Sequence, residues 1–243
     1  MPDRKLRRES LVDHEHFDFR DAWQELLPPN ILVCAGPFLA DATPLTDRER
    51  RSAGAVDSER MRELESGRIY AKRALSLLGI NNVELPVGPD RAPVWPRGIL
   101  GSLTHVRDVR GGHCAAAVGR STDFRAIGID VEYDSGLAPE IWPKILTSLE
   151  LQELLELPVV ARASEVVSRW CVKEAAAKAA KLPFEPLEIG TERKGSDNER
   201  VMKWVLKLPS KYGVIGECPG HTTRSRPFIF AAVVSEKNAT KIN

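Results

Sequence analysis

The sequence has few of the features that stabilise small secreted proteins or mark membrane proteins. Its four cysteines, Cys34, Cys114, Cys171 and Cys218, are far apart and form no C-x-x-C pair, so neither a disulfide scaffold nor a structural zinc site is indicated. The longest apolar stretch, residues 31–40, contains a glycine and a proline and is far shorter than the roughly 20 residues that span a bilayer. The basic N-terminus lacks the apolar segment of a secretory signal. These absences predict a soluble, cytoplasmic protein.

An excess of charge of one sign is also missing. The chain has 35 basic and 34 acidic residues, a formal net charge of +1, and so no overall electrostatic reason to bind nucleic acid or a membrane. Any anion site must therefore be local. The basic run at residues 4–8 is expected to be a solvated tail. With 243 residues, 42% of them hydrophobic, the chain can form one large domain or two small ones with real cores.

Hydrophobic patterning predicts an α+β protein in which helices alternate with mostly antiparallel strands. A small-residue turn is expected at residues 101–105, and the two strands that flank residues 121–123 are expected to form a hairpin. Helices are expected at 46–78 with pauses near Gly54 and Gly67, at 139–157 and at 164–181. Strands are expected at 31–35, 112–118, 125–132, 187–191, 201–208 and 227–234. His221 is expected in a polar loop.

Two acidic residues alternate along the strand expected at 125–132, where residues 127–132 read IGIDVE. The three aliphatic side chains would face a core, and Gly128, Asp130 and Glu132 would share the other face. Two carboxylates at this spacing lie about 7 Å apart and repel each other unless a cation lies between them. Gly128 leaves room beside them. The pattern fits a metal-binding pair or an exposed, solvated strand face.

The strongest helix places Trp170, Glu174 and Lys178 on one stripe, at positions i, i+4 and i+8. A glutamate followed by a lysine four residues later is also an ordinary helix-stabilising surface pair. By itself the stripe therefore leaves both interpretations open.

Taken in order, three motifs resemble those of the 4′-phosphopantetheinyl transferases, and most of all the Sfp-like class that activates surfactin and enterobactin synthetases. They are RAPVWPRGILGSLTH (91–105), IGIDVE (127–132) and WCVKEAAAKA (170–179). Upstream, ERMRELESGRIYAKRAL (59–75) is similar to the arginine-bearing helix of that family. The resemblance extends from Arg60 to about Lys181. It implies two similar α/β halves related by a pseudo-twofold axis, with the active site between them.

The resemblance implies a reaction in which the 4′-phosphopantetheine arm of coenzyme A is transferred to a serine of an acyl or peptidyl carrier protein, releasing 3′,5′-ADP. It implies Mg²⁺, or alternatively Mn²⁺, as the metal cofactor, with Asp130, Glu132 and Glu174 as ligands. A hard cation prefers carboxylate and phosphate oxygens, and phosphoryl transfer depends on neutralising phosphate charge.

The same resemblance implies the roles of individual side chains. Glu174 is the expected general base, and Lys178 is expected to stabilise the leaving nucleotide. Arginines suit bidentate phosphate contacts, although each is also explained as a solvated helix charge. Thr104 and His105 are expected to meet the ribose 3′-phosphate. The full set expected to bind coenzyme A is Arg60, Arg68, Asp90, Arg91, Thr104, His105, Asp130, Lys173, Glu174 and Lys178.

The implied organisation has a nucleotide-binding half at 1–122 and a half at 123–243 that carries the metal ligands and catalytic helix. The expected partners are coenzyme A and a carrier protein that docks beside the cleft. Neither nucleic acid nor a membrane is an expected partner, and the chain is expected to be a monomer.

Two alternatives remain open from the residues. A metal-dependent nuclease or phosphodiesterase also combines Asp, Glu and Lys, but its Glu and Lys usually lie two apart on a strand, and near-neutral charge does not favour DNA. A non-catalytic module that only binds carrier proteins is the second alternative. DNA cleavage without coenzyme A would indicate the nuclease, and carrier binding without a mass gain would indicate the module.

Overall fold

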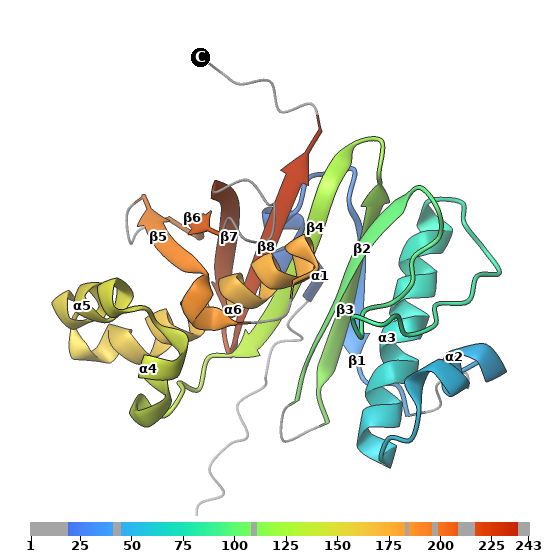
Figure 1. The fold of residues 1–243 in the computed structure, drawn as a ribbon, viewed down its shortest axis with the longest axis horizontal. Coiled ribbons are helices and arrows are strands. Elements are labelled where there is room, and N and C mark those ends of the chain that lie inside the picture. The colour runs from blue at the N-terminus through green and yellow to red at the C-terminus, as the bar shows by residue number, and fades with distance from the viewer. Residues whose placement is uncertain are drawn as a thin grey trace, which may run out of the picture.

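Two antiparallel sheets form the centre of the molecule (Figure 1). The computed structural model describes residues 19–40, 45–107, 111–182, 185–195, 199–208 and 217–237. The first sheet has the order β1-β3-β2, with β1 (Leu32–Pro37), β2 (Ile99–Val106) and β3 (His113–Arg120). The second has the order β4-β8-β7-β6-β5, with β4 (Phe124–Tyr133), β5 (Gly190–Lys194), β6 (Val201–Lys207), β7 (Glu217–Ser225) and β8 (Phe228–Glu236). The expected α+β class is confirmed.

Each sheet is covered by one long helix (Figure 1). Helix α3 (Ser58–Leu77) packs on the three-stranded sheet, preceded by α2 (Asp47–Ala53), and α6 (Val159–Ala180) packs on the five-stranded sheet. Helix α1 (Phe19–Leu26) contacts β1, β7 and β8. The short helices η1 (Pro139–Ile141), α4 (Trp142–Ile145), α5 (Ser148–Glu156) and η2 (Pro186–Glu188) lie between β4 and β5 in the sequence, around α6.

The two sheets meet where β2 lies against β4. Side chains of β2 satisfy backbone donors of β4: Ser102 Oγ accepts from Ile129 N at 3.1 Å, and Thr104 Oγ1 accepts from Val131 N at 3.2 Å. Buried backbone N–H groups need hydrogen-bond acceptors. Here the acceptors are side-chain hydroxyls of β2 and not the backbone carbonyls of a paired strand. The junction therefore brings Ser102 and Thr104 of β2 next to the acidic strand.

The expected hairpin of residues 112–132 is wrong, because β3 and β4 belong to different sheets. Strand β3 pairs with β1 and β2, whereas β4 pairs with β8. The turn expected at residues 101–105 is also wrong, because these residues lie inside strand β2, paired with β3 along its whole length. His221, expected in a loop, lies on β7. Long-range pairing decided each case, and local sequence carries little information about it.

Helix boundaries follow their capping residues. The expected pause near Gly54 separates α2, which begins with a capping box at Thr46 and Glu49, from α3, which is capped by Asp57. The pause expected near Gly67 is wrong, because α3 continues through it. The helical region expected at 139–157 consists of η1, α4 and α5, and Thr147 begins α5 with a second capping box. Helix α6 starts five residues earlier than the expected Ser164.

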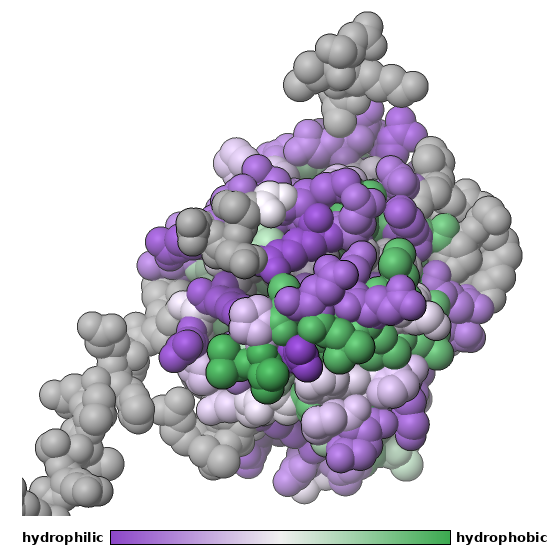
Figure 2. Space-filling view, turned by 90° about the vertical axis from the view of Figure 1, so that its left-hand side faces the viewer, coloured by the Kyte–Doolittle hydropathy of each residue, from purple (hydrophilic) through white to green (hydrophobic). Residues whose placement is uncertain are grey.

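Apolar side chains reach the surface near α5 and the start of α6 (Figure 2). The exposed ones include Leu149, Leu155, Val159 and Val160. Within the described residues, no helix combines the length and apolar character that crossing a membrane requires.

Candidate functional site

The acidic motif lies on β4 with its acids turned toward α6. Ile127, Ile129 and Val131 are buried in the core formed with α1 and β8, so alternation turns Gly128, Asp130 and Glu132 to the opposite face. A Cβ added at Gly128 would lie 1.9 Å from the carbonyl oxygen of Ala175. The space beside Gly128 is therefore filled by the α6 backbone. This close approach brings the acids of β4 within reach of α6 side chains.

Asp130 is the centre of the cluster. Its Oδ1 accepts from Thr104 Oγ1 at 2.9 Å and from Lys178 Nζ at 2.5 Å, so residues from β2, β4 and α6 meet at one buried atom. Its other oxygen, Oδ2, is buried and has no hydrogen-bond partner in the described part of the chain. A buried carboxylate oxygen without a partner is costly, which makes Oδ2 a natural position for a cation.

Lys178 supplies positive charge between two of the acids. Its Nζ lies 3.4 Å from Glu174 Oε2 in addition to its contact with Asp130, and its side chain is 32% exposed. Burial lowers the pKa of Lys178, but the charges of Asp130 and Glu174 raise it above its ordinary value. The lysine therefore stays charged at neutral pH.

The other two acids are held with raised pKa values. Burial and, to a smaller extent, the charge of Asp130 raise the pKa of Glu132 to about 7. The hydrogen bond that Trp170 Nε1 donates to Glu132 Oε1 at 3.0 Å opposes this increase only in part. Burial and the charge of Asp130 also raise the pKa of Glu174. Carboxylates that raise one another's pKa values in this way are stabilised by a cation bound between them.

The donor set fits a hard divalent cation in its chemistry. Three carboxylates face one place, all of their ligating atoms are oxygens, and Asp130 Oδ2 is unpartnered among the described residues. As the side chains lie in the described ranges, no group of three or more His, Cys, Asp or Glu residues is placed to hold a metal ion. The Lys178 ammonium is instead the cation that contacts Asp130 and Glu174.

A basic cluster lies beside the acids, on the N-terminal side of the junction. Arg60 Nη1 lies 3.3 Å from His105 Nε2 and 2.8 Å from Glu63 Oε2. Arg107 Nε lies 2.5 Å from Glu63 Oε1. Burial would raise the pKa of Glu63, but hydrogen bonds from Arg107 and Arg60 hold it below its ordinary value. Arg60 and His105 thus lie together, and one acid, Glu63, holds the basic groups in place.

The sequence motifs did not predict that Arg107 belongs to this basic cluster. Its signal was its position two residues after His105, which places both side chains on the same face of an extended segment.

The remaining predicted nucleotide-binding residues lie around the proline-rich loop. Arg68 is only 5% exposed, and its Nε donates to the carbonyl of Leu85 at 2.6 Å; burial lowers its pKa to about 10. Arg68 thus braces the start of the loop, and its phosphate contact stays a prediction. Asp90 Oδ1 accepts from the backbone of Ala92 at 3.1 Å, and exposed Arg91 has a left-handed φ of 63°.

The prediction that Lys173 contacts phosphate is wrong in this structure. Lys173 is fully buried, and its Nζ donates to Glu150 Oε2 and to the carbonyls of Ile145 and Pro186. Adjacent residues on a helix point about 100° apart, so Lys173 faces α4 and α5 while Glu174 faces β4. A fully occupied ammonium has no donor left for a phosphate.

Comparison with known proteins agrees with this geometry. Residues 47–119 match the model of the 4′-phosphopantetheinyl transferase N-terminal domain, and residues 126–201 match that of the 4′-phosphopantetheinyl transferase superfamily. The chain is 35% identical over 121 residues to 4′-phosphopantetheinyl transferase Npt of Nocardia iowensis, covering 50% of this chain and 52% of that protein. It is 32% identical over 138 residues to PptT of Mycobacterium tuberculosis, covering 56% and 58%.

A third relative is enterobactin synthase component D of Salmonella typhimurium, 36% identical over 106 residues, covering 43% of this chain and 40% of that protein. Among solved structures, the Thermotoga maritima holo-[acyl-carrier-protein] synthase aligns with a TM-score of 0.37 and 24% identity, covering 47% of this chain and 64% of that one. The chain spans about half the length of the curated relatives Npt and PptT. Together the two family models match most of the chain between residues 47 and 201. The chain therefore belongs to the 4′-phosphopantetheinyl transferase superfamily.

Proposed function

We propose that this protein transfers the 4′-phosphopantetheine arm of coenzyme A to a serine of an acyl or peptidyl carrier protein, with Mg²⁺ as cofactor. The observation that carries the proposal is the meeting of Asp130, Glu174 and Lys178 beside the Arg60–His105 cluster, from separate elements. Acids that attract a cation and bases that attract phosphates lie next to each other, as a nucleotide diphosphate requires.

In the proposed reaction, the serine oxygen attacks the phosphorus that bears the pantetheine arm. The bond from this phosphorus to the bridging oxygen of the diphosphate breaks, and 3′,5′-ADP leaves. Glu174 accepts the serine proton, because its carboxylate is the partly exposed member of the acid cluster that the serine can reach. Lys178 stabilises the negative charge that develops on the leaving diphosphate oxygen.

Asp130, Glu132 and Glu174 would hold the metal ion. When bound, Mg²⁺ supplies charge neutralisation on the diphosphate and fixes its orientation. Thr104, which donates a hydrogen bond to Asp130, orients that carboxylate, and its contact with the 3′-phosphate stays a prediction. Arg60 and His105 bind the 3′-phosphate of coenzyme A, Arg107 adds charge beside them, and Asp90 and Arg91 hold the nucleotide. A monomeric, cytoplasmic state stays a prediction.

Intact-mass spectrometry of apo carrier proteins tests the proposal. Carriers from fatty acid, polyketide, peptide and siderophore assembly are incubated with the protein and coenzyme A, with Mg²⁺ or with a chelator. We expect at least one carrier to gain one phosphopantetheine group, only when Mg²⁺ and coenzyme A are both present. Carrier binding without a mass gain would indicate a non-catalytic module, and cleavage of added DNA without coenzyme A would indicate a nuclease; either result rejects the proposal.

A further inference from the structure

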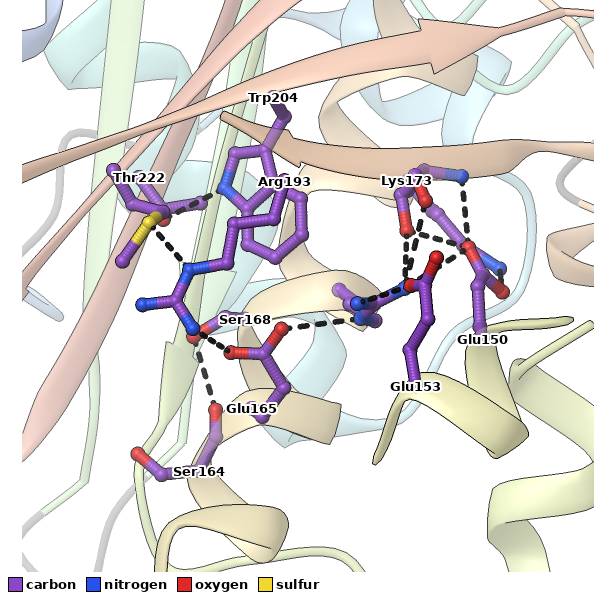
Figure 3. Close-up of polar contacts among 12 residues, drawn as sticks. Glu150, Glu153, Ser164, Glu165, Ser168, Lys173, Arg193, Trp204 and Thr222 are labelled. Atoms are coloured by element: carbon purple, nitrogen blue, oxygen red, sulfur yellow. Dashed lines mark hydrogen bonds and ion pairs between the residues drawn. The ribbon is translucent and has the colours of Figure 1, made fainter. Parts of the chain in front are cut away.

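The face of α6 that points away from the acid cluster carries a buried polar network (Figure 3). At its centre Lys173 Nζ lies 2.7 Å from Glu150 Oε2, 2.8 Å from the carbonyl oxygen of Ile145 and 3.0 Å from that of Pro186. An ammonium has three protons, and all three are used. Lys173 therefore connects α6 to α4, α5 and η2 at one point.

Glu150 is the acceptor that the network shares. It closes the capping box of α5 with Thr147, and its Oε1 accepts from the backbone N–H of Thr191 on β5 at 2.8 Å. Burial would raise the pKa of Glu150, but Lys173 and Thr191 lower it below its ordinary value. One ionised carboxylate thus joins the start of α5, the start of β5 and the middle of α6.

Arg169 repeats this anchoring one turn earlier on the same face. Its guanidinium donates to Glu165 at 3.1 Å and to Glu153 at 2.9 Å, and it stacks over Trp204 on β6 at 5.4 Å. Arg169 is 2% exposed. Two buried cations at positions i and i+4 therefore hold α6 from this side.

The residues that follow these two cations form the stripe that faces the acid cluster. Trp170 follows Arg169 and donates to Glu132, and Glu174 follows Lys173 and contacts Lys178. Because neighbouring residues on a helix are fixed about 100° apart, any rotation of α6 that moves Lys173 also moves Glu174. The face of α6 that carries Arg169 and Lys173 therefore moves together with the face that carries Trp170 and Glu174.

We propose that the Lys173–Glu150 ion pair is a positioning device that sets the rotation of α6 and so aims Trp170 and Glu174 at the acids of β4. The inference rests on the proposed transferase function. Lys173 would then affect the reaction by positioning Glu174, and not by the phosphate contact that the sequence predicted. Both residues of the pair are positioning residues.

The test uses the Lys173→Met variant, which keeps an unbranched side chain one atom shorter and removes the ammonium group. Transfer kinetics give kcat and the KM for coenzyme A, and two-dimensional NMR follows the indole N–H of Trp170, assigned with a Trp170→Phe sample. We expect kcat to fall by about tenfold to a hundredfold, as small misplacements of catalytic groups do. We also expect an unchanged KM for coenzyme A and a shifted Trp170 indole signal.

Lys72→Met is the matched control. Lys72 pairs with buried Glu49 at 2.8 Å in the other half of the molecule, so its loss also leaves a buried glutamate without its cation. We expect this control to lose stability while the Trp170 indole signal stays in place.

Two results would overturn the inference. If Lys173→Met lost stability but kept the wild-type kcat and indole signal, the ion pair would be only structural. If KM for coenzyme A rose while kcat stayed the same, Lys173 would be a phosphate contact after all. Should Lys173→Met fail to fold, Glu150→Gln, which keeps the shape and an acceptor oxygen, is measured in the same way. Should the wild-type protein transfer nothing, the proposed function fails, and the indole signal alone decides the positioning role.

Discussion

Glu174 reaches the acid cluster from α6 with a side chain that is still 25% exposed. An attacking serine can therefore approach it, whereas Asp130 is 2% exposed and already bonded to Thr104 and Lys178. In the proposed reaction this exposure favours Glu174 as the base, while the buried Asp130, which accepts two hydrogen bonds, is suited to hold charge in place.

Glu174→Gln should abolish most of the transfer and preserve the fold. The amide has the same shape but accepts no proton at neutral pH, so kcat is expected to fall by a factor on the order of 10² to 10⁴. Intact-mass kinetics measure the loss, and circular dichroism checks the fold. Glu156→Gln, at an exposed position of α5, is the control. Wild-type rates in Glu174→Gln would show that the base is another group.

His105→Ala should weaken the binding of coenzyme A with a smaller effect on the chemical step. The imidazole lies beside Arg60 at the predicted 3′-phosphate position, and losing one such contact raises KM without lowering kcat in proportion. The KM for 3′-dephospho-coenzyme A should barely change. An equal rise in KM for both substrates would place the 3′-phosphate elsewhere.

At the residue scale, the acids of the cluster could be predicted from the sequence, but the position of Lys173 could not. Asp130, Glu132 and Glu174 were named from the family resemblance, whereas periodicity placed the two strand acids on one face and left a solvated surface equally open. Lys173 was adjacent to a site residue in the sequence, and only the position of Glu150, 23 residues earlier, shows that it points inward. Long-range ion pairs leave no local signal.

Strand β4 and helix α6 form the element pair on which the site depends. Gly128 permits their close approach, and the buried Ala175, Ala176 and Ala177 present small side chains on the facing helix. The sequence predicted that Gly128 leaves space, but it gave no indication that a helix backbone fills that space.

Gly128→Ala should separate these two elements. The added methyl group would overlap the carbonyl oxygen of Ala175, and overpacking of this kind costs about 1–3 kcal/mol of unfolding free energy. Because the clash moves α6 relative to Asp130, we expect transfer to fall more than stability does. Urea unfolding and transfer kinetics measure both quantities. Gly190→Ala, on β5 where an added Cβ would make only an ordinary 3.5 Å contact with Lys207, controls for the backbone change; unchanged transfer in Gly128→Ala would contradict the packing described.

The Glu150 network should make stability depend on acid pH. The folded pKa of Glu150 lies below its ordinary value of 4.5, so the ionised carboxylate stabilises the folded state above that pH. This contribution is lost as pH falls through the folded pKa. We expect the difference in unfolding free energy between wild type and Glu150→Gln to shrink below about pH 4.5. A difference that stayed constant throughout acid pH would contradict the ionised state of Glu150.

Element boundaries were predictable where caps and periodicity are strong, and strand pairing was not. Helix α3 and strands β4, β6 and β8 follow their local patterns. Strand β2 looked like a turn because it is rich in small and polar residues, whose burial against β3 and β4 only the folded chain reveals. The division at residues 122 and 123 stays a prediction.

At the scale of the whole molecule, the site exists because two sheets meet edge to edge. Strand β2 supplies Thr104 and His105, and β4 with α6 supplies the acids and Lys178. Neither sheet holds the complete set. This arrangement explains why three separated motifs were more informative together than any one of them was alone.

Titration with Mn²⁺, followed by the electron paramagnetic resonance of the free ion, tests the central claim most directly. In the presence of coenzyme A, the wild-type chain should bind one Mn²⁺ and lose it on addition of excess Mg²⁺. Asp130→Asn should weaken that binding by at least about tenfold, because it removes charge at the atom around which the site is built. Equal Mn²⁺ affinity in the wild type and Asp130→Asn, or no binding to the wild type, would contradict a metal site formed by these acids.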